Sequence, residues 1–231
     1  MYDSMNDKKN KVKNIFDSIA FRYDFLNHLL SFGVDHYWRR KALQLSKVGS
    51  NSFLLDVACG TGDVAIEAHK QGVRKIVGAD FSHNMLGLFK KKSEWIVGKV
   101  IQTTAEQMPF RDNTFTNITV AFGVRNFYNI KEGFKSFHRV LKPSGKATVI
   151  EFQMPENKIF KSLYKFYFKR ILPFIGGIVS KNKSAYQYLP ESVEEFDEKI
   201  SLVDLLKEAG FKLVKKYKLT FGIVQVVIAE K

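Results

Sequence analysis

Residues 53–63 read FLLDVACGTGD, and this stretch decides the fold. A short apolar run containing Asp56 is interrupted by Gly60 and Gly62 before a helical pattern begins at Val64. The stretch therefore predicts a buried strand, a tight glycine turn and a helix. In such a unit the glycines let the backbone pass close to a ligand, while the acids lie near the carboxyl end of the strand.

The spacing of the glycines discriminates between ligands. The dinucleotide fingerprint G-x-G-x-x-G is missing, because Gly62 is followed by Asp63, Val64 and Ala65. Two carboxylates beside the turn would repel a pyrophosphate, whereas they suit a nucleoside that carries a positive charge. The stretch resembles the first motif of class I S-adenosylmethionine (SAM) methyltransferases. This resemblance implies SAM as methyl donor and a binding loop made of Asp56, Gly60, Thr61 and Gly62.

Two further loops complete the expected donor site. Asp80 closes a predicted second strand about 20 residues beyond the glycine turn, where an acid can accept hydrogen bonds from both ribose hydroxyls. It could instead cap the helix that begins near Asn84. Thr104 and Ala105 follow a predicted third strand. SAM enzymes usually carry Asp or Asn before this Ala to contact the adenine amino group, and here the Thr104 hydroxyl would make that contact.

Strands and helices alternate along the chain, which predicts a doubly wound α/β sheet. The 231 residues suffice for one large domain with a full core. We expect a single class I SAM-dependent methyltransferase domain over residues 1–231. The resemblance implies a Rossmann-like seven-stranded sheet, mostly parallel with an antiparallel C-terminal strand and helices on both faces. The remaining strands are expected at residues 115–121, 146–151, 212–218 and 224–230.

Charge and cysteine content limit the partners and the compartment. A net charge of +14 requires an anionic partner, for which nucleic acid and an acidic membrane are the usual candidates. The single cysteine, Cys59, excludes a disulfide framework and a cysteine-based zinc site, so we expect a reducing cytosol and no metal. Neither a signal peptide nor a spanning apolar run is recognised.

Two segments are expected to cover the substrate. Residues 1–45 combine a Lys-rich amphipathic helix with a stretch dense in aromatic residues, which predicts a helical lid. Residues 156–195 form a basic aromatic insert, in which residues 158–190 hold seven basic residues and no acid. Its lysines at intervals of three and four beside many aromatic residues are typical of an interfacial membrane helix. A helix that merely covers the substrate crevice fits the same pattern.

Three stretches resemble the menaquinone and ubiquinone biosynthesis C-methyltransferases. The first is YDFLN at residues 23–27, followed by LSFG at residues 30–33 and by Trp38. The second is FGVRN at residues 122–126, and the third runs from Arg139 to Glu151. The chain departs from the first signature, with Leu26 in place of Met and Asp35 where His is common. No role for a histidine at Asp35 is therefore carried over.

This resemblance implies methyl transfer from SAM to a ring carbon of a reduced polyprenyl naphthoquinol, converting demethylmenaquinol to menaquinol. Arg125, Asn126 and Tyr23 are the expected catalytic residues around the ring hydroxyl. Because a guanidinium is a poor base, we expect Arg125 to stabilise the naphtholate, with water or Asp24 accepting the proton. Arg125 could instead form a salt bridge with an acid of the crevice.

Two alternative functions remain open. The same signatures serve the benzoquinol of the ubiquinone pathway, and a non-catalytic membrane-binding module could retain a Rossmann-like core. A nucleic-acid methyltransferase is disfavoured, because AFGVRN at residues 121–126 replaces the Asn/Asp-Pro-Pro-aromatic motif and Cys59 lies in the SAM loop. The expected location is cytoplasmic, on the inner face of the cytoplasmic membrane. The oligomeric state stays open, with a homodimer among the alternatives.

Overall fold

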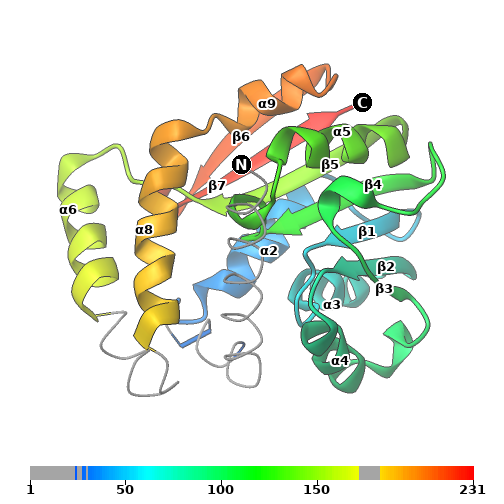
Figure 1. Cartoon of the computed structure of the whole chain (residues 1–231), viewed down its shortest axis with the longest axis horizontal. Helices are drawn as coiled ribbons and strands as arrows, with labels where there is room; N and C mark the ends of the chain where they lie inside the picture. Colours follow the sequence, from blue (N-terminus) through cyan, green and yellow to red (C-terminus); the bar gives the residue numbers. More distant parts are fainter. Residues whose placement is uncertain (1–23, 25–27, 30, 172–182) are drawn as a thin grey trace, which may run out of the picture.

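The structure is a computed structural model that describes residue 24 and residues 28–29, 31–171 and 183–231. Tyr23 and the predicted Lys-rich helix of the N-terminal segment lie outside the described residues. The order of the elements along the chain follows the expected alternation of strands and helices (Figure 1).

Seven strands form one mixed sheet in the order β3-β2-β1-β4-β5-β7-β6. The first five strands run parallel to one another, while β7 is antiparallel to both of its neighbours. The predicted fold class, including the antiparallel C-terminal strand, is confirmed. The strands are β1 Phe53–Val57, β2 Lys75–Asp80, β3 Val100–Gln102, β4 Phe115–Ala121, β5 Leu141–Phe152, β6 Leu213–Leu219 and β7 Val224–Glu230.

Helices cover both faces of this sheet (Figure 1). Buried residues of α5, α8 and α9 share one core with β4 and β5, whereas those of α3 and α4 share another with β1 and β2. The helices are α2 Val34–Leu45, α3 Asp63–Lys70, α4 His83–Lys92, α5 Ile130–Val140, α6 Lys158–Phe166, α8 Lys183–Lys199 and α9 Leu202–Glu208. Short 3₁₀ turns occupy Glu94–Ile96, Ala105–Gln107, Val124–Asn126 and Thr220–Gly222, and a π turn occupies Tyr167–Ile171.

The described part of the expected N-terminal lid packs directly on the sheet. Ala42 and Leu43 of α2 are fully buried, and Trp38 is 5% exposed. The indole nitrogen of Trp38 donates a hydrogen bond of 2.7 Å to the Thr220 hydroxyl, which follows β6. Helix α2 is therefore part of the packed core and not a separate cover.

Strand β5 begins earlier than expected. The sequence predicts a turn at Pro143 and Gly145 before a strand from Lys146, but β5 already starts at Leu141. The reason is that Leu141 pairs with Phe115 of β4, and the register shifts before pairing resumes at Asn117 and Lys146. The turn residues therefore lie within an irregular part of the strand rather than ahead of it.

The order of the strands fixes where a ligand can bind. From β1 the chain adds β2 and β3 on one side and then crosses to β4 on the other. The chain therefore continues in opposite directions after the carboxyl ends of β1 and β4. Such a topological switch point is where open α/β sheets bind their ligands. The glycine loop after β1 and residues 122–126 after β4 meet at this point.

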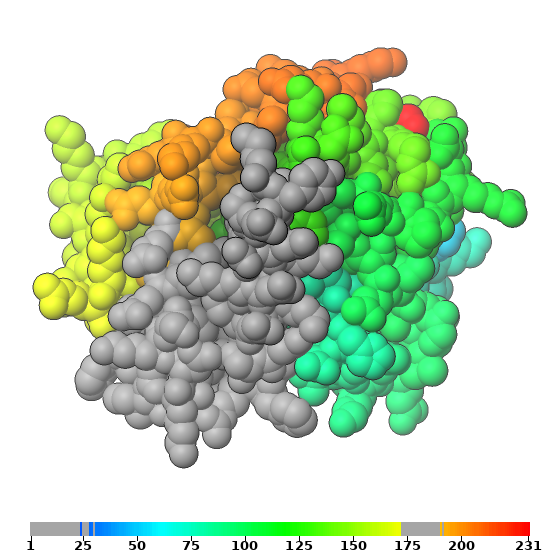
Figure 2. Space-filling view, viewed as in Figure 1, coloured from blue at the N-terminus to red at the C-terminus, as the bar shows by residue number. Residues whose placement is uncertain are grey.

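Helix α6 lies at the outer edge of the molecule, away from the sheet (Figure 1 and Figure 2). It leaves apolar side chains exposed to solvent. Ile159, Leu163 and Phe166 are 60–71% exposed, whereas Tyr164 is buried. Their spacing of four and three residues places the exposed side chains on one face. No helix among the described residues is long and apolar enough to cross a membrane.

Candidate cofactor and acceptor site

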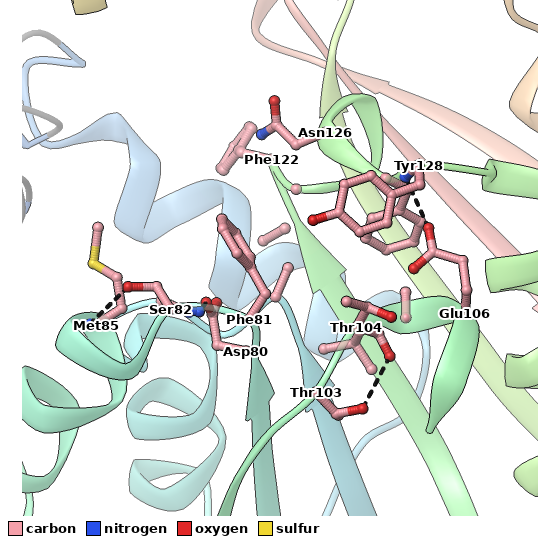
Figure 3. Close-up of a pocket in the computed structure, with 17 residues that line it drawn as sticks. Asp80, Phe81, Ser82, Met85, Thr103, Thr104, Glu106, Phe122, Asn126 and Tyr128 are labelled. Carbon is pink, nitrogen blue, oxygen red and sulfur yellow. Dashed lines mark hydrogen bonds between the residues drawn. The ribbon is translucent and has the colours of Figure 1, made fainter. Parts of the chain in front are cut away.

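A cleft opens at the carboxyl ends of β1, β2 and β4 (Figure 3). Its empty volume is about 720 Å³, including the mouth that opens to solvent. The lining combines backbone of the glycine loop with apolar and polar side chains from three further loops. It consists of Val57, Ala58, Gly60, Asp80, Phe81, Ser82, Met85, Thr103, Thr104, Ala105, Glu106, Ala121, Phe122, Gly123, Asn126, Phe127 and Tyr128.

The Asp80 carboxylate connects the glycine loop to the residues that follow β2. Its Oδ2 accepts a hydrogen bond of 2.8 Å from the Gly60 amide, and its Oδ1 accepts one of 2.8 Å from the Ser82 amide. The alternative role as a helix cap is filled by Ser82, whose hydroxyl accepts from the Met85 amide at the start of α4. Each carboxylate oxygen retains acceptor capacity, so Asp80 can serve the ribose hydroxyls that the sequence predicts for it.

The two glycines of the loop perform different tasks. Both have a positive φ, +53° at Gly60 and +87° at Gly62. A Cβ atom on Gly60 would meet no atom within 4 Å, because Gly60 faces the open cleft. A Cβ atom on Gly62 would lie 2.1 Å from the Phe89 ring of α4. Gly62 therefore allows the loop to pack on α4, whereas Gly60 keeps the cleft free.

Asp56 lies behind the cleft rather than in its lining. It is 1% exposed, and its Oδ1 accepts a hydrogen bond of 2.8 Å from the Thr119 hydroxyl of β4. Burial raises the pKa of Asp56 to about 7, against the smaller opposing effect of that hydrogen bond. Its Oδ2 has no hydrogen-bond partner among the described residues. The cleft lining thus includes the predicted donor-site residues Gly60, Asp80, Thr104 and Ala105, whereas Asp56, Thr61 and Gly62 do not line it.

Two aromatic walls of the cleft were not predicted from the sequence. Phe81 and Tyr128 line it from opposite loops, and the Tyr128 hydroxyl points into the cleft (Figure 3). The Glu106 carboxylate holds the Tyr128 loop by accepting from the amides of Tyr128 and Asn129 at 2.8 and 3.1 Å. Burial and the charge of Glu106 raise the pKa of Tyr128, so its hydroxyl remains a donor. The position of Phe81 directly after Asp80 was the signal that could have identified it.

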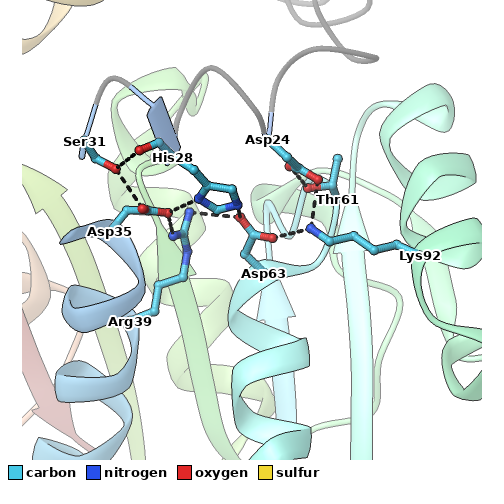
Figure 4. Close-up of polar contacts among 8 residues, drawn as sticks. All are labelled: Asp24, His28, Ser31, Asp35, Arg39, Thr61, Asp63 and Lys92. Carbon is cyan, nitrogen blue, oxygen red and sulfur yellow. Dashed lines mark hydrogen bonds and ion pairs between the residues drawn. The ribbon is translucent and has the colours of Figure 1, made fainter. Parts of the chain in front are cut away.

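An ionic cluster ties the N-terminal region to the glycine loop (Figure 4). Lys92 of α4 pairs with Asp24 at 2.8 Å and with Asp63 at the start of α3. The other oxygen of Asp24 accepts a hydrogen bond from the Thr61 hydroxyl. Burial alone would lower the pKa of Lys92, but Asp63 and Asp24 raise it. The predicted donor-site residue Thr61 is therefore held by Asp24, which Lys92 in turn links to Asp63.

The same cluster continues to α2. Arg39 pairs with Asp35 and lies 3.2 Å from Asp63, while the His28 Nδ1 atom lies 2.6 Å from Asp35. Burial would raise the pKa of Asp35, but Arg39 and the Ser31 hydroxyl lower it to about 2. His28, Asp35 and His36 approach one another within 4.8 Å, a spacing that could hold a cation. A cation there would compete with Arg39 for the same carboxylate, so we assign no metal to it.

The two predicted catalytic residues that follow β4 lie in different surroundings. Asn126 lines the cleft, whereas Arg125 does not. The Arg125 Nη1 atom lies 2.6 Å from Glu151 and donates to the Phe122 carbonyl oxygen at 2.7 Å. These two charged side chains are 7% and 0% exposed. The salt bridge to a crevice acid, which the sequence left open as an alternative, is thus the arrangement observed for Arg125.

A cluster of aromatic rings lies beside the cleft and meets the Arg125–Glu151 pair. Phe122 belongs to both, because it lines the cleft and its ring centroid lies 4.5 Å from that of Phe152. The Arg125 Cζ atom lies 5.9 Å from the Phe152 ring centroid. Centroids are separated by 5.9–6.0 Å for Trp38–Phe122, Trp38–Phe152 and Phe152–Phe168, and by 4.2 Å for Tyr164–Phe168. These five residues (Trp38, Phe122, Phe152, Tyr164 and Phe168) form one aromatic cluster, which reaches the cleft through Phe122.

Solved structures with a similar fold include SAM-dependent methyltransferases. A SAM-dependent methyltransferase from Thermotoga maritima superposes with a TM-score of 0.66 at 17% identity, covering 94% of this chain and 99% of that one. At this identity the likeness concerns the fold alone. It agrees with the order of strands and with the cleft at the switch point.

Sequence relatives cover nearly the whole chain. The ubiquinone/menaquinone biosynthesis C-methyltransferase UbiE of Geotalea uraniireducens is 43% identical over 98% of this chain and 99% of its own length. A demethylmenaquinone methyltransferase of Chlorobaculum tepidum is 43% identical over 96% of this chain and 93% of its own. The sequence model of the ubiE/COQ5 methyltransferase family matches residues 4–231. The chain therefore belongs to the ubiE/COQ5 methyltransferase family and is a SAM-dependent methyltransferase.

Proposed function

We propose that this enzyme methylates a ring carbon of a reduced polyprenyl naphthoquinol, converting demethylmenaquinol to menaquinol. This proposal rests on the position of Phe122. The residue lines the donor cleft and also packs in the aromatic cluster. A flat quinol in that cluster would lie next to the methyl group of SAM in the cleft. The name of the Chlorobaculum relative refers to the same substrate.

The donor would be held mainly by backbone and by Asp80. Gly60 leaves room for the methionine part of SAM, Asp80 accepts from the ribose, and Thr104 with Ala105 contacts the adenine. Phe81 and Tyr128 offer ring faces and edges to the purine (Figure 3). Asp56, Thr61 and Gly62 fix the shape of the loop through Thr119, Asp24 and Phe89 without lining the cleft.

The chemistry requires a nucleophilic ring carbon placed in line with the sulfonium. Loss of the proton of a ring hydroxyl gives a naphtholate, whose neighbouring carbon forms a bond to the methyl group as the bond to sulfur breaks. The products are S-adenosylhomocysteine and a ring that regains aromaticity when the methylated carbon loses its proton. Arg125 stabilises the naphtholate, and Asn126 orients the ring oxygen from the wall of the cleft.

Water is the better candidate for accepting the hydroxyl proton. Both oxygens of Asp24 are already engaged, one by Lys92 and the other by Thr61. Tyr23 lies outside the described residues, and its place beside the ring hydroxyl stays a prediction.

A benzoquinol of the ubiquinone pathway is the second candidate substrate, because the name of the Geotalea relative refers to both pathways. The deciding experiment is methyl transfer from labelled SAM to reduced demethylmenaquinone and to the corresponding benzoquinol, compared by kcat/KM. A clear preference for the naphthoquinol supports the proposal. A preference for the benzoquinol assigns the enzyme to the other pathway, and failure with both quinols rejects quinol methylation.

We also propose that α6 rests on an anionic membrane at the inner face of the cytoplasmic membrane. The exposed apolar side chains of Ile159, Leu163 and Phe166 can enter the headgroup region. Lys158 and Lys161 have no ion-pair partner among the described residues and can contact lipid phosphates. Such a location gives a polyprenyl substrate a short path from the bilayer to the aromatic cluster.

A further inference from the structure

The Tyr164 hydroxyl is buried without a hydrogen-bond partner. Tyr164 is 6% exposed, and among the described residues no donor or acceptor pairs with its oxygen. The Nε atom of Arg125 is likewise buried without a partner. Native structures leave few buried polar groups unsatisfied, because each one has lost water without gaining a replacement. Two such groups in one region call for a common explanation.

Both groups border the aromatic cluster. The Tyr164 ring packs on Phe168 at 4.2 Å, Phe168 packs on Phe152, and Arg125 lies over Phe152. Arg125, Glu151 and Asp197 are the charged groups whose field acts on the Tyr164 hydroxyl, together with the neighbouring Tyr167. The two unsatisfied groups therefore share one electrostatic environment, next to the region where the quinol ring is proposed to bind.

The chemistry of these two groups defines what could satisfy them. Burial raises the pKa of the Tyr164 hydroxyl well above its usual value near 10, so the hydroxyl keeps its proton. An arginine side chain also stays protonated, and its Nε–H can only donate. Neither group can serve as the base, and both lack an acceptor. An oxygen that gains negative charge during the reaction supplies that acceptor.

We propose that the Tyr164 hydroxyl and the Arg125 Nε–H bind the ionised ring oxygen of the acceptor, which makes Tyr164 a further catalytic residue. This inference rests on the proposed quinol methylation. The hydroxyl proton of the quinol passes to water, and the resulting oxyanion accepts hydrogen bonds from both groups while they keep their protons. After methyl transfer and loss of the ring proton, the oxyanion of the product takes up a proton from water and the quinol leaves.

The test is Tyr164→Phe, which removes only the hydroxyl. Loss of one donor to a developing oxyanion lowers kcat by about 100-fold. The equilibrium Kd for SAM should stay unchanged, because Tyr164 does not line the donor cleft. The melting temperature should stay equal or rise, since no hydrogen bond of the resting protein is lost. Tyr37→Phe, at a half-exposed site on α2, is the matched control and should keep the wild-type rate.

The pH profile provides a readout that a packing role would not change. Hydrogen bonds to the oxyanion lower the pKa of the bound quinol, so Tyr164→Phe should move the rise of kcat to higher pH. Each tenfold loss of kcat at neutral pH corresponds to a displacement of the pH profile by about one pH unit. A rate equal to wild type with both quinols overturns the inference, and so does a loss of activity that parallels a lower melting temperature.

The outcome for the wild-type enzyme separates this inference from the function on which it rests. A wild-type enzyme that methylates neither quinol defeats both. An active wild-type enzyme with an equally active Tyr164→Phe variant defeats only the assignment of Tyr164.

Discussion

The Nζ atom of Lys92 lies 2.8 Å from the Oδ2 atom of Asp24, a residue 68 positions earlier in the chain. Because Lys92 also pairs with Asp63, one lysine of α4 links the N-terminal region to the first turn of α3 (Figure 4). Lys92 thus lies between two carboxylates beside the glycine loop, and Arg39 supplies a second positive charge to Asp63. The mutual repulsion of the two carboxylates is relieved where the donor is expected to bind.

Replacing this lysine should loosen the glycine loop. We expect Lys92→Met to lower the free energy of unfolding by about 1 kcal/mol, since the lysine is only partly exposed and its loss leaves Asp24 without its ion pair and Asp63 with Arg39 alone. SAM should bind several-fold more weakly, and Lys92→Arg should restore most of both losses. Urea unfolding and calorimetric SAM titration measure these effects. Lys91→Met, at the exposed neighbouring position, is the control, and equal results for the two Met variants contradict the prediction.

The two glycines of the loop should respond differently to alanine. Gly62→Ala places a methyl group against Phe89 and should cost about 1–3 kcal/mol of stability through overpacking. Gly60→Ala meets no neighbour, so it should cost only about 1 kcal/mol for its positive φ. Its methyl group should nevertheless weaken SAM binding by about tenfold, equal to about 1.4 kcal/mol. Melting temperature and SAM affinity measure the two effects, and the reverse ranking would refute this division of tasks.

Asp56 should make the protein less stable as the pH rises from about 4 to about 7. Burial raises the pKa of Asp56 from 3.8 to about 7, so the native state holds a proton that the unfolded chain releases in this window. The unfolded state binds fewer protons there, so stability falls by a few kcal/mol as the pH increases, on the order of 1.4 kcal/mol for each pH unit between the two pKa values. Asp56→Asn should remove this fall.

Urea unfolding at pH 5 and pH 8 measures this difference. Asp112→Asn serves as the control, because the side chain of Asp112 is 66% exposed and should leave the pH dependence unchanged. An Asp56→Asn variant with the wild-type pH dependence would show that Asp56 is ionised in the folded protein.

Arg125 should contribute separately to stability and to turnover. Arg125→Ala leaves Glu151 as a fully buried carboxylate without its partner and should cost about 3–5 kcal/mol of stability. It should also abolish turnover while SAM affinity stays nearly intact, because Arg125 does not line the cleft. The double variant Arg125→Gln/Glu151→Gln removes both charges and should recover most of the stability. Its turnover should remain at least about 100-fold below wild type, and a wild-type rate would remove Arg125 from the catalytic site.

The lysines of α6 and of the π turn that follows it should differ in their contribution to membrane binding. Lys165 and Lys169 both pair with Glu194 of α8, whereas Lys158 and Lys161 have no such partner among the described residues. Lys158→Gln/Lys161→Gln should therefore weaken binding to phosphatidylglycerol vesicles by about 2 kcal/mol at low salt, about 1 kcal/mol per lysine. Lys165→Gln/Lys169→Gln should have a smaller effect.

Vesicle sedimentation at two salt concentrations compares these variants. Ile159→Ser/Leu163→Ser/Phe166→Ser should weaken binding at both salt concentrations, because the apolar contribution is not screened. Equal binding of all variants and wild type would leave α6 as a plain cover of the substrate site.

Much of the fold could be predicted because it depends on local patterns. The boundaries of β4 and β7, at Phe115–Ala121 and Val224–Glu230, agree with the sequence prediction to the residue, since apolar runs between turn residues define them. The start of β5 was missed, because it depends on how Leu141 pairs with Phe115 in the neighbouring strand. No local pattern encodes that register.

The sequence by itself determined the order of strands and helices, the glycine loop and its acids, and the signatures of the family. These features depend on residues that are close along the chain, so spacing and residue type suffice to recognise them. Only the tertiary structure decided that Asp56 lies behind the cleft, that Arg125 turns to Glu151, and that Phe122 joins the cleft to the aromatic cluster. Such contacts join residues that are distant in sequence, and they are set by the order of the strands and by the packing of helices on the sheet. FLLDVACGTGD therefore specifies which donor binds, whereas the three-dimensional packing around it specifies where the acceptor can meet that donor.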